Sequence, residues 1–349
     1  MPLEPYSFIN LFSIMVGMEV LTMSKKDLPE TMTLVRDNIM AYKNPLAVSA
    51  KENAAWADDL NLPKTGDILF YTGGEYQLLP FLDSLMAVMD LVKPGGAAFS
   101  WMMNLRDLVH KVGPAPEKIF ASVFAQDKER YFGINRKAAK ILLNLGYDLA
   151  YDGANEIYSG ALLHEMGFED ALGAYSRTVG DYLRRTQAKT VVCLSPHAAE
   201  VFKLVYPKYK DFPALTVKTF PEMVWAKRDQ LPVCESDTIY ALHDSCRMAR
   251  ELGVSQELRD ILDAMQISYV EPERRGAWTT CCGGPIKMTY PDLSHKLGLG
   301  RVEELAATGA THAIVSCPFC LSALTLKKHK PFLMVEDFVE VVARGYGDA

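Results

Sequence analysis

Residues 310–327 read ATHAIVSCPFCLSALTLK, an apolar run followed by a Cys-Pro-x-Cys turn and then by a segment with helical spacing. A second stretch, residues 188–205, reads AKTVVCLSPHAAEVFKLV and follows the same plan, with Ser-Pro-x-Ala at the turn. Repetition of one supersecondary unit is typical of a chain built from similar parts. We therefore predict two related α/β halves, at residues 66–233 and 234–349.

Short apolar runs alternate with amphipathic segments throughout these two halves. The predicted strands are Ile68–Tyr71, Asp148–Tyr151, Thr190–Leu194, Leu215–Val217, Thr238–Leu242, Ile267–Val270, Ala313–Ser316 and Phe332–Met334. The predicted helices include residues 136–146, 171–187, 255–265, 292–309 and 337–345. Strands that alternate with helices at this spacing favour parallel, Rossmann-like sheets. No GxGxxG motif follows a predicted strand and no GxxxxGK[ST] motif occurs, so nothing here supports a nucleotide site.

Two segments fall outside the repeat. We predict that residues 1–65 form a helical extension, and that residues 78–133 are an insertion with no counterpart in the second half. The apolar run 6–18 is too short to span a bilayer, and we interpret it as a buried helix or docking arm, with contact at a membrane surface as the alternative. No secretory signal pattern is present. The expected compartment is the cytoplasm, with membrane association through partners.

The composition is that of an ordinary folded protein, with 49% hydrophobic and 23% charged residues among 349. The formal net charge of −6 argues against a nucleic-acid partner, because such proteins normally present a basic surface. Cysteines in a reducing compartment are more often metal ligands or redox groups than disulfides.

Five of the seven cysteines, all at or beyond residue 246, have the spacing C-x34-CC-x34-CxxC. They are Cys246, Cys281, Cys282, Cys317 and Cys320, whereas Cys193 and Cys234 are interpreted as a core residue and an incidental one. Each set follows a predicted strand or opens a predicted helix. Because the carboxyl ends of parallel strands meet at one edge of a sheet, distant loops can present five thiols to one point.

Thiolates are the ligands that iron–sulfur clusters, zinc and copper(I) prefer. Gly283 allows a close backbone approach and an N–H donor to a sulfur atom. Two adjacent thiols can bind neighbouring irons of one cluster, which favours an iron–sulfur cluster. Three alternatives stay open: a structural zinc site using four of the thiols, a metal-free CxxC redox site, and thiols that are merely buried.

Polar residues flank the cysteines. His243 and Asp244 precede Cys246, and we predict His243 as a catalytic proton donor to a leaving thiolate, since histidine titrates near neutral pH. The alternative is a hydrogen-bonded loop pair that orients the cluster. Arg274 and Arg275 could bind an anionic substrate or partner, or form a solvated turn.

The motifs HDSC, CCGG and SCPFC, which contain these five cysteines, resemble the cysteine-rich CCG domain found in the B and D subunits of the heterodisulfide reductase family. That family also includes glycolate oxidase iron–sulfur subunits. The resemblance covers residues 66–349 and is most specific in the second half. It implies a duplicated α/β fold and a non-cubane [4Fe-4S] cluster held by the five cysteines. It also implies that a disulfide, or sulfur bound to a carrier, is reduced or formed in one-electron steps.

The first half departs from this pattern because its thiols are missing. Gly74 stands where the first cysteine is expected, Tyr158 and Ser159 replace the CC pair, and Ser195 and Ala198 replace the CxxC pair. Hydroxyl and methyl groups hold iron poorly. We therefore predict one cluster rather than two.

The chain also lacks the ferredoxin-type CxxCxxCxxxCP run. The resemblance therefore implies a separate ferredoxin-like iron–sulfur subunit as electron donor, with a flavoprotein subunit as a further partner. The expected substrate is a small thiol or disulfide, or a sulfur carrier. Two alternatives remain: a subunit that relays electrons to a quinone or flavin partner, and a scaffold subunit with a structural zinc.

Overall fold

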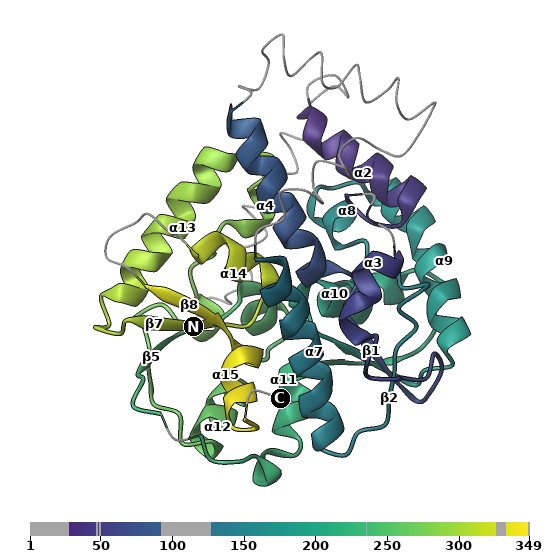
Figure 1. The fold of residues 1–349 in the computed structure, drawn as a ribbon. Helices are drawn as coiled ribbons and strands as arrows, with labels where there is room; N and C mark the ends of the chain where they lie inside the picture. Colours follow the sequence, from purple (N-terminus) through teal and green to yellow (C-terminus); the bar gives the residue numbers. More distant parts are fainter. Residues whose placement is uncertain are drawn as a thin grey trace, which may run out of the picture.

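The computed structural model describes residues 28–46, 48, 50–91, 127–234, 236–325 and 333–347. Within these ranges the chain forms two four-stranded parallel sheets surrounded by helices (Figure 1), which confirms the predicted α/β class. The first sheet has the order β2-β1-β3-β4 and consists of β1 (Ile68–Tyr71), β2 (Leu149–Ala150), β3 (Thr190–Cys193) and β4 (Thr216–Thr219). The second has the order β6-β5-β7-β8 and consists of β5 (Tyr240–His243), β6 (Tyr269–Val270), β7 (His312–Val315) and β8 (Met334–Asp337).

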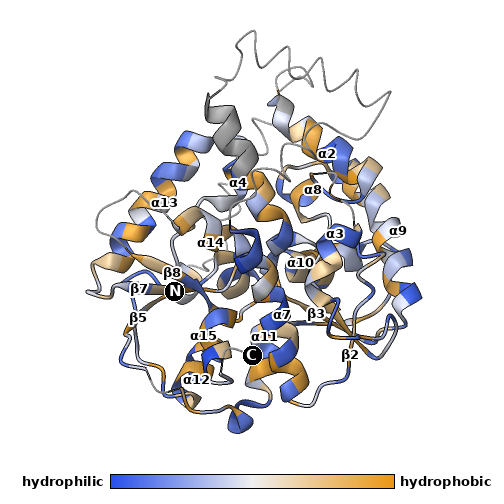
Figure 2. Ribbon diagram, in the orientation of Figure 1, coloured by the Kyte–Doolittle hydropathy of each residue, from blue (hydrophilic) through white to orange (hydrophobic). Residues whose placement is uncertain are grey.

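Both sheets thus share one strand order, as expected for related halves. The helices of the first half are α4 (Glu75–Leu91), α7 (Lys128–Asn144), α8 (Ala161–Glu165), α9 (Glu169–Thr186), α10 (Pro196–Glu200) and α11 (Phe220–Trp225). Those of the second are α12 (Gln256–Ala264), α13 (Pro291–Ala306), α14 (Pro318–Leu324) and α15 (Phe338–Arg344). Helix α9 is amphipathic: it carries both hydrophilic and hydrophobic residues (Figure 2), and Leu172, Val179 and Leu183 on it are buried at helical spacing.

The strand register gives a residue-by-residue map between the halves. Strand β1 pairs with β3 so that Tyr71 lies opposite Cys193, and β5 pairs with β7 so that His243 lies opposite Val315. Counting onward from these strand ends, Gly74 corresponds to Cys246 and Ser195 to Cys317. The positions inferred for the missing thiols therefore agree with the backbone.

The same correspondence continues beyond the last strand of each sheet. Thr219 ends β4 and forms a capping box with Glu222 at the start of α11. Asp337 ends β8 and forms a capping box with Glu340 at the start of α15. An N-cap of this kind stabilises its helix by about 1 kcal/mol. The final helix of each half therefore begins with the same kind of capping box.

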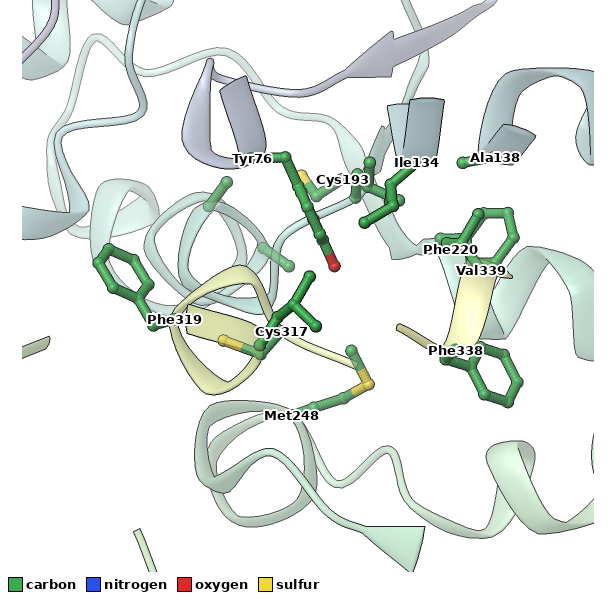
Figure 3. Close-up of a cluster of buried hydrophobic side chains, with 14 of the residues drawn as sticks. Tyr76, Ile134, Ala138, Cys193, Phe220, Met248, Cys317, Phe319, Phe338 and Val339 are labelled. Atoms are coloured by element: carbon green, nitrogen blue, oxygen red, sulfur yellow. The ribbon is translucent and has the colours of Figure 1, made fainter. Parts of the chain in front are cut away.

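Helices α4 and α7 lie between the two sheets (Figure 1). Helix α4 packs against α14 of the second half, and α7 packs against α15. Figure 3 shows the shared core, in which Tyr76, Ile134 and Phe220 of the first half lie near Phe338 and Val339 of the second. The halves are therefore joined by one continuous hydrophobic core.

The predicted helical extension is confirmed in part. Residues Glu30–Tyr42 form α2 and residues Ala50–Ala54 form α3. The apolar run 6–18 and residues 92–126 of the predicted insertion lie outside the described residues. Among the residues that are described, no helix is both long enough and apolar enough to cross a membrane. The exact domain boundaries stay a prediction.

Candidate metal centre

The five cysteines come from the ends of three neighbouring strands. Cys246 follows β5, Cys281 and Cys282 lie in the loop after β6, and Cys317 is the N-cap of α14 after β7, with Cys320 in the first turn of that helix. Strand β5 lies between β6 and β7 in the sheet. The parallel topology therefore brings residues 246–320 of the chain to one edge of the second sheet.

The five sulfur atoms form one connected group. Cys246 Sγ lies 4.0 Å from Cys281 Sγ. Cys281 and Cys282, Cys282 and Cys320, and Cys320 and Cys317 lie close enough for each thiol to shift the pKa of the next. The last three thiols are buried, with exposures of 1–2%, whereas Cys246 and Cys281 are partly exposed. The group thus has one deep side and one side toward solvent.

The CCGG turn contacts this group through backbone N–H groups. Gly283 N donates to Cys281 Sγ, and Gly284 N donates to Cys282 Sγ, each at 3.4 Å. Gly283 adopts a left-handed conformation with φ of +77°, and a Cβ there would lie 2.8 Å from Ser294 O. Glycine is therefore required at this position for both backbone conformation and space.

Crowding of the thiols changes their acidity. Hydrogen bonds from Cys246 and Cys282 lower the pKa of Cys281 to about 2. Burial raises the pKa of Cys317, but its hydrogen bonds with Cys320 and His197 lower it further than burial raises it. The three thiols that donate these bonds have raised pKa values. Contact among the thiols therefore favours loss of a proton from the group, with the negative charge shared through its neighbours.

Buried negative charge in proteins is normally paired with a cation or bound to a metal. Soft thiolates with backbone N–H donors to sulfur are the donor set of iron–sulfur clusters. The residues present therefore fit a thiolate-bound iron–sulfur cluster. Within the described residues, no three His, Cys, Asp or Glu side chains are spaced to ligate a single metal ion.

His243 lies directly beside the cysteines. Arg301 Nε donates to His243 Nδ1 at 2.9 Å, so the ring hydrogen is on Nε2, which lies 3.3 Å from Cys320 Sγ. Burial and the charge of Arg301 lower the pKa of His243 to about 3. The imidazole is therefore neutral and donates an N–H toward sulfur. Its proposed catalytic role stays a prediction.

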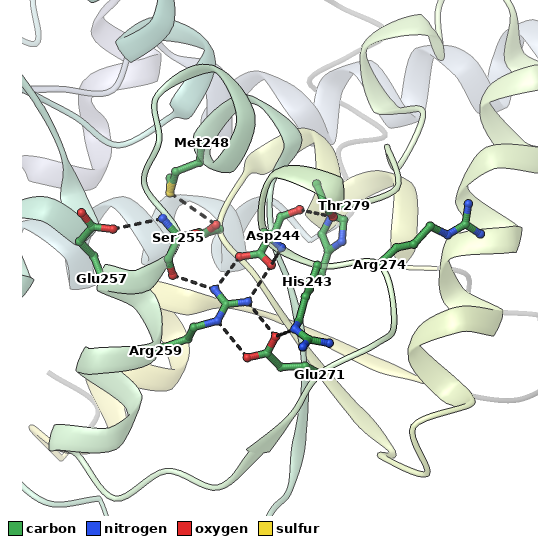
Figure 4. Close-up of polar contacts among 12 residues, drawn as sticks. His243, Asp244, Met248, Ser255, Glu257, Arg259, Glu271, Arg274 and Thr279 are labelled. Carbon is green, nitrogen blue, oxygen red and sulfur yellow. Dashed lines mark hydrogen bonds and ion pairs between the residues drawn. The ribbon is translucent and has the colours of Figure 1, made fainter. Parts of the chain in front are cut away.

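Asp244 anchors the loop that carries Cys246 (Figure 4). Arg259 binds the Asp244 carboxylate with two hydrogen bonds of 2.9 Å, and Gly276 N donates to the same carboxylate at 2.6 Å. Burial raises the pKa of Asp244, but the guanidinium of Arg259 outweighs this and lowers it. These contacts tie the β5 loop to the segment that precedes the CC pair.

Two arginines of this network were not predicted from the sequence. Arg301 is fully buried and also donates to Arg274 O at 2.9 Å. A signal was available, since Arg301 falls on the buried face of α13 between Gly298 and Leu305. Arg259 likewise lies between the buried Leu258 and Ile261 of α12.

Arg274 and Arg275 themselves have exposed side chains. Arg274 pairs with Glu304, and Arg275 pairs with Glu271. Both arginines thus have carboxylate partners within the chain. An anion-binding role for them stays a prediction.

The corresponding edge of the first sheet holds oxygen atoms instead of thiols. Glu75, which follows Gly74, accepts hydrogen bonds from Ser159 Oγ at 2.9 Å and from Ser195 Oγ. Ser159 and Ser195 are the residues that replace cysteines in this half. Burial raises the pKa of Glu75 to about 7. No pattern in the sequence indicated that a carboxyl group would fill this place.

Comparison with known proteins agrees with this geometry. Residues 240–325 match the CCG family, described as a cysteine-rich domain. The second half contains a CCG domain. The matched residues include all five clustered cysteines, and the family resemblance seen in the motifs is confirmed.

Several known proteins are similar to this CCG-domain chain. The D subunit of dihydromethanophenazine:CoB–CoM heterodisulfide reductase from Methanosarcina barkeri is 27% identical, over 60% of this chain and 54% of that protein. A probable membrane-anchored ferredoxin from Chromohalobacter salexigens is 25% identical, over 93% of this chain and 43% of that protein. A probable iron-sulfur-binding oxidoreductase from Bacillus subtilis, FadF, is 27% identical, over 59% of this chain and 30% of that protein. The chain thus spans about half, or less, of the length of these relatives.

Proposed function

We propose that this chain is an iron–sulfur redox subunit of a complex similar to heterodisulfide reductase. In this proposal Cys246, Cys281, Cys282, Cys317 and Cys320 hold one non-cubane [4Fe-4S] cluster. The connected group of five sulfur atoms in the CCG domain carries the proposal. Several relatives are named as reductases, oxidoreductases or iron–sulfur proteins, which supports the redox assignment.

The reaction we propose is reduction or formation of a disulfide, or of sulfur bound to a carrier. Reduction of a disulfide consumes two electrons and two protons and yields two thiols. Such a cluster supplies electrons one at a time and an iron position for the sulfur of the substrate. The chain's own residues hold the thiolates in place, and Gly283 and Gly284 donate N–H groups to sulfur. The partly exposed Cys246 and Cys281 mark the side from which a small thiol or disulfide would approach.

Electrons would come from a partner. We propose a ferredoxin-like iron–sulfur subunit as the donor and a flavoprotein as a further subunit. None of the five corresponding positions in the first half is a cysteine, which supports a single cluster per chain; these residues are Gly74, Tyr158, Ser159, Ser195 and Ala198. Anaerobic co-purification of such subunits with the full chain would support this assembly.

Metal analysis of matched variants tests the cluster. Cys282 and Cys193 are both buried cysteines, one in each half, so Cys282→Ala and Cys193→Ala form a fair pair. We expect four irons and four acid-labile sulfides in wild type and in Cys193→Ala, and a large loss of both in Cys282→Ala. Zinc without sulfide in the wild type would favour the scaffold alternative and contradict the proposal.

Paramagnetic resonance distinguishes catalysis from electron relay. We expect that adding a thiol substrate to the oxidised protein produces a new paramagnetic signal, because sulfur binds an iron. An unchanged spectrum over a range of thiols, in a protein that retains its iron, would instead favour a subunit that relays electrons to a quinone or flavin partner.

A further inference from the structure

The half that lacks the five clustered cysteines contacts the metal centre of the other half. The register places His197, on α10, at the position that Phe319 occupies on α14 between the two cysteines of the CxxC turn. The two rings pack against each other, with centroids 4.6 Å apart. The corresponding turns of the two halves therefore face each other directly.

His197 also interacts with one of the five cysteines. Its imidazole lies close enough to Cys317 for each side chain to shift the pKa of the other. His197 has 2% of its surface exposed and Cys317 has 1%, so water cannot replace this contact. A buried imidazole of the first half thus lies beside a cysteine of the second.

The orientation of the ring is fixed by a carboxylate. His197 Nδ1 forms a short contact with Glu165 Oε1 on α8. Since Nδ1 is bound to Glu165, Nε2 is the nitrogen that remains for Cys317. Arg247, which follows Cys246, lies 3.8 Å from Glu165 and 2.8 Å from Glu200. Glu165 is therefore in contact with a side chain from each half, His197 of the first and Arg247 of the second.

We propose that His197, oriented by Glu165, is a positioning residue that donates a hydrogen bond from Nε2 to Cys317 and raises the reduction potential of the cluster. This inference rests on the cluster assigned under the proposed function. Reduction adds negative charge that is spread over the sulfur atoms, and hydrogen-bond donors to sulfur favour the more negative state. The first half, which lacks the five clustered cysteines, thus adjusts the redox centre of the second.

Two amide substitutions separate the two contacts of the ring. The amide of glutamine in His197→Gln lies near the position of Nε2 and retains a donor toward Cys317. The shorter amide in His197→Asn lies near Nδ1 and retains only the contact with Glu165. His164→Gln is a matched control, since His164 lies on the same helix as Glu165 and pairs with Glu169 on the surface.

The experiment is a redox titration of the full chain with its cluster, followed by paramagnetic resonance, with iron measured in every sample. We expect the midpoint potential of His197→Asn to lie about 59 mV below that of the wild type. For one electron, this shift corresponds to a tenfold change in the equilibrium constant for reduction. His197→Gln should stay near the wild-type value, and His164→Gln should match it.

A wild-type midpoint in His197→Asn, with iron retained, would overturn the inference. Equal loss of iron from His197→Asn and His197→Gln would also overturn it, because that result indicates a purely structural role. Absence of any iron–sulfur signal from the wild-type protein would instead contradict the proposed function. The two failures are therefore distinguishable.

Discussion

Gly284 is the position at which the packing of the metal centre can be tested most sharply by a single methyl group. A Cβ at Gly284 would lie 2.7 Å from Phe319 O and 2.8 Å from Phe319 Cβ. Both atoms belong to the turn between Cys317 and Cys320. The neighbouring atoms are backbone and Cβ, which cannot rotate away. Gly284→Ala must therefore push the CCGG turn and α14 apart.

Forcing a methyl group into a packed interior costs about 1–3 kcal/mol. Gly300 provides the control, because it lies within α13 and a Cβ there would have no atom within 4 Å. Replacing glycine by alanine in a helix interior stabilises the fold by about 0.5–1 kcal/mol. The two glycine-to-alanine variants should therefore differ by about 1.5–4 kcal/mol in free energy of unfolding, with opposite signs relative to wild type.

Urea unfolding of the metal-free proteins measures the stability, and anaerobic reconstitution measures the iron that each variant retains. We expect Gly284→Ala to unfold at lower urea and to bind less iron, since the N–H of residue 284 moves away from Cys282. Gly300→Ala should bind iron as the wild type does. The packing argument is refuted if Gly284→Ala is as stable as Gly300→Ala and retains full iron.

Three further predictions concern the residues around the centre. Asp244→Ala removes the carboxylate that binds Arg259, and should lower the free energy of unfolding by about 3 kcal/mol; a loss below about 1 kcal/mol in urea unfolding would contradict the anchoring role. Thr219→Ala removes the cap of α11 and should cost about 1 kcal/mol by the same measurement without changing the iron content; an iron loss would contradict this. Glu75 has a folded pKa raised to about 7, so its contribution to stability is complete at low pH and is lost as the pH rises through 7. Between pH 5 and 8 the wild type should therefore lose up to about 3 kcal/mol more stability than Glu75→Gln, and parallel pH profiles of the two proteins would refute this.

The sequence was sufficient to predict the fold because each strand is a short apolar run bounded by polar turns. All eight predicted strands are present, with ends shifted by a few residues. The largest shift is at β8, predicted at residues 332–334 and observed as Met334–Asp337. Glu336 and Asp337 resemble loop residues in the sequence. They are buried in the strand because Arg344 pairs with the first and Tyr76 donates to the second.

The meeting of the five cysteines was predicted from the sequence, but the residues around them were not. The spacing of the cysteines and the parallel topology were enough to predict that five thiols meet at one sheet edge. The contact of His197 with Phe319 depends on how the two halves face each other, and the contacts of Glu75 depend on how separate loops of the first half meet. No local pattern encodes either. Arg259 and Arg301 depend on helix faces that bury a charge against partners distant in the sequence. Such residues become visible only when both sides of a contact are in place.

The central claim is that one iron–sulfur cluster lies among the five sulfur atoms at the edge of the second sheet. Anomalous diffraction at the iron absorption edge, from crystals of the anaerobically prepared chain, tests it most directly. We predict a single group of iron peaks bounded by Cys246, Cys281, Cys282, Cys317 and Cys320. Iron beside Glu75, Ser159 and Ser195 in the first half would contradict the account. So would the lack of any iron peak at the five sulfur atoms.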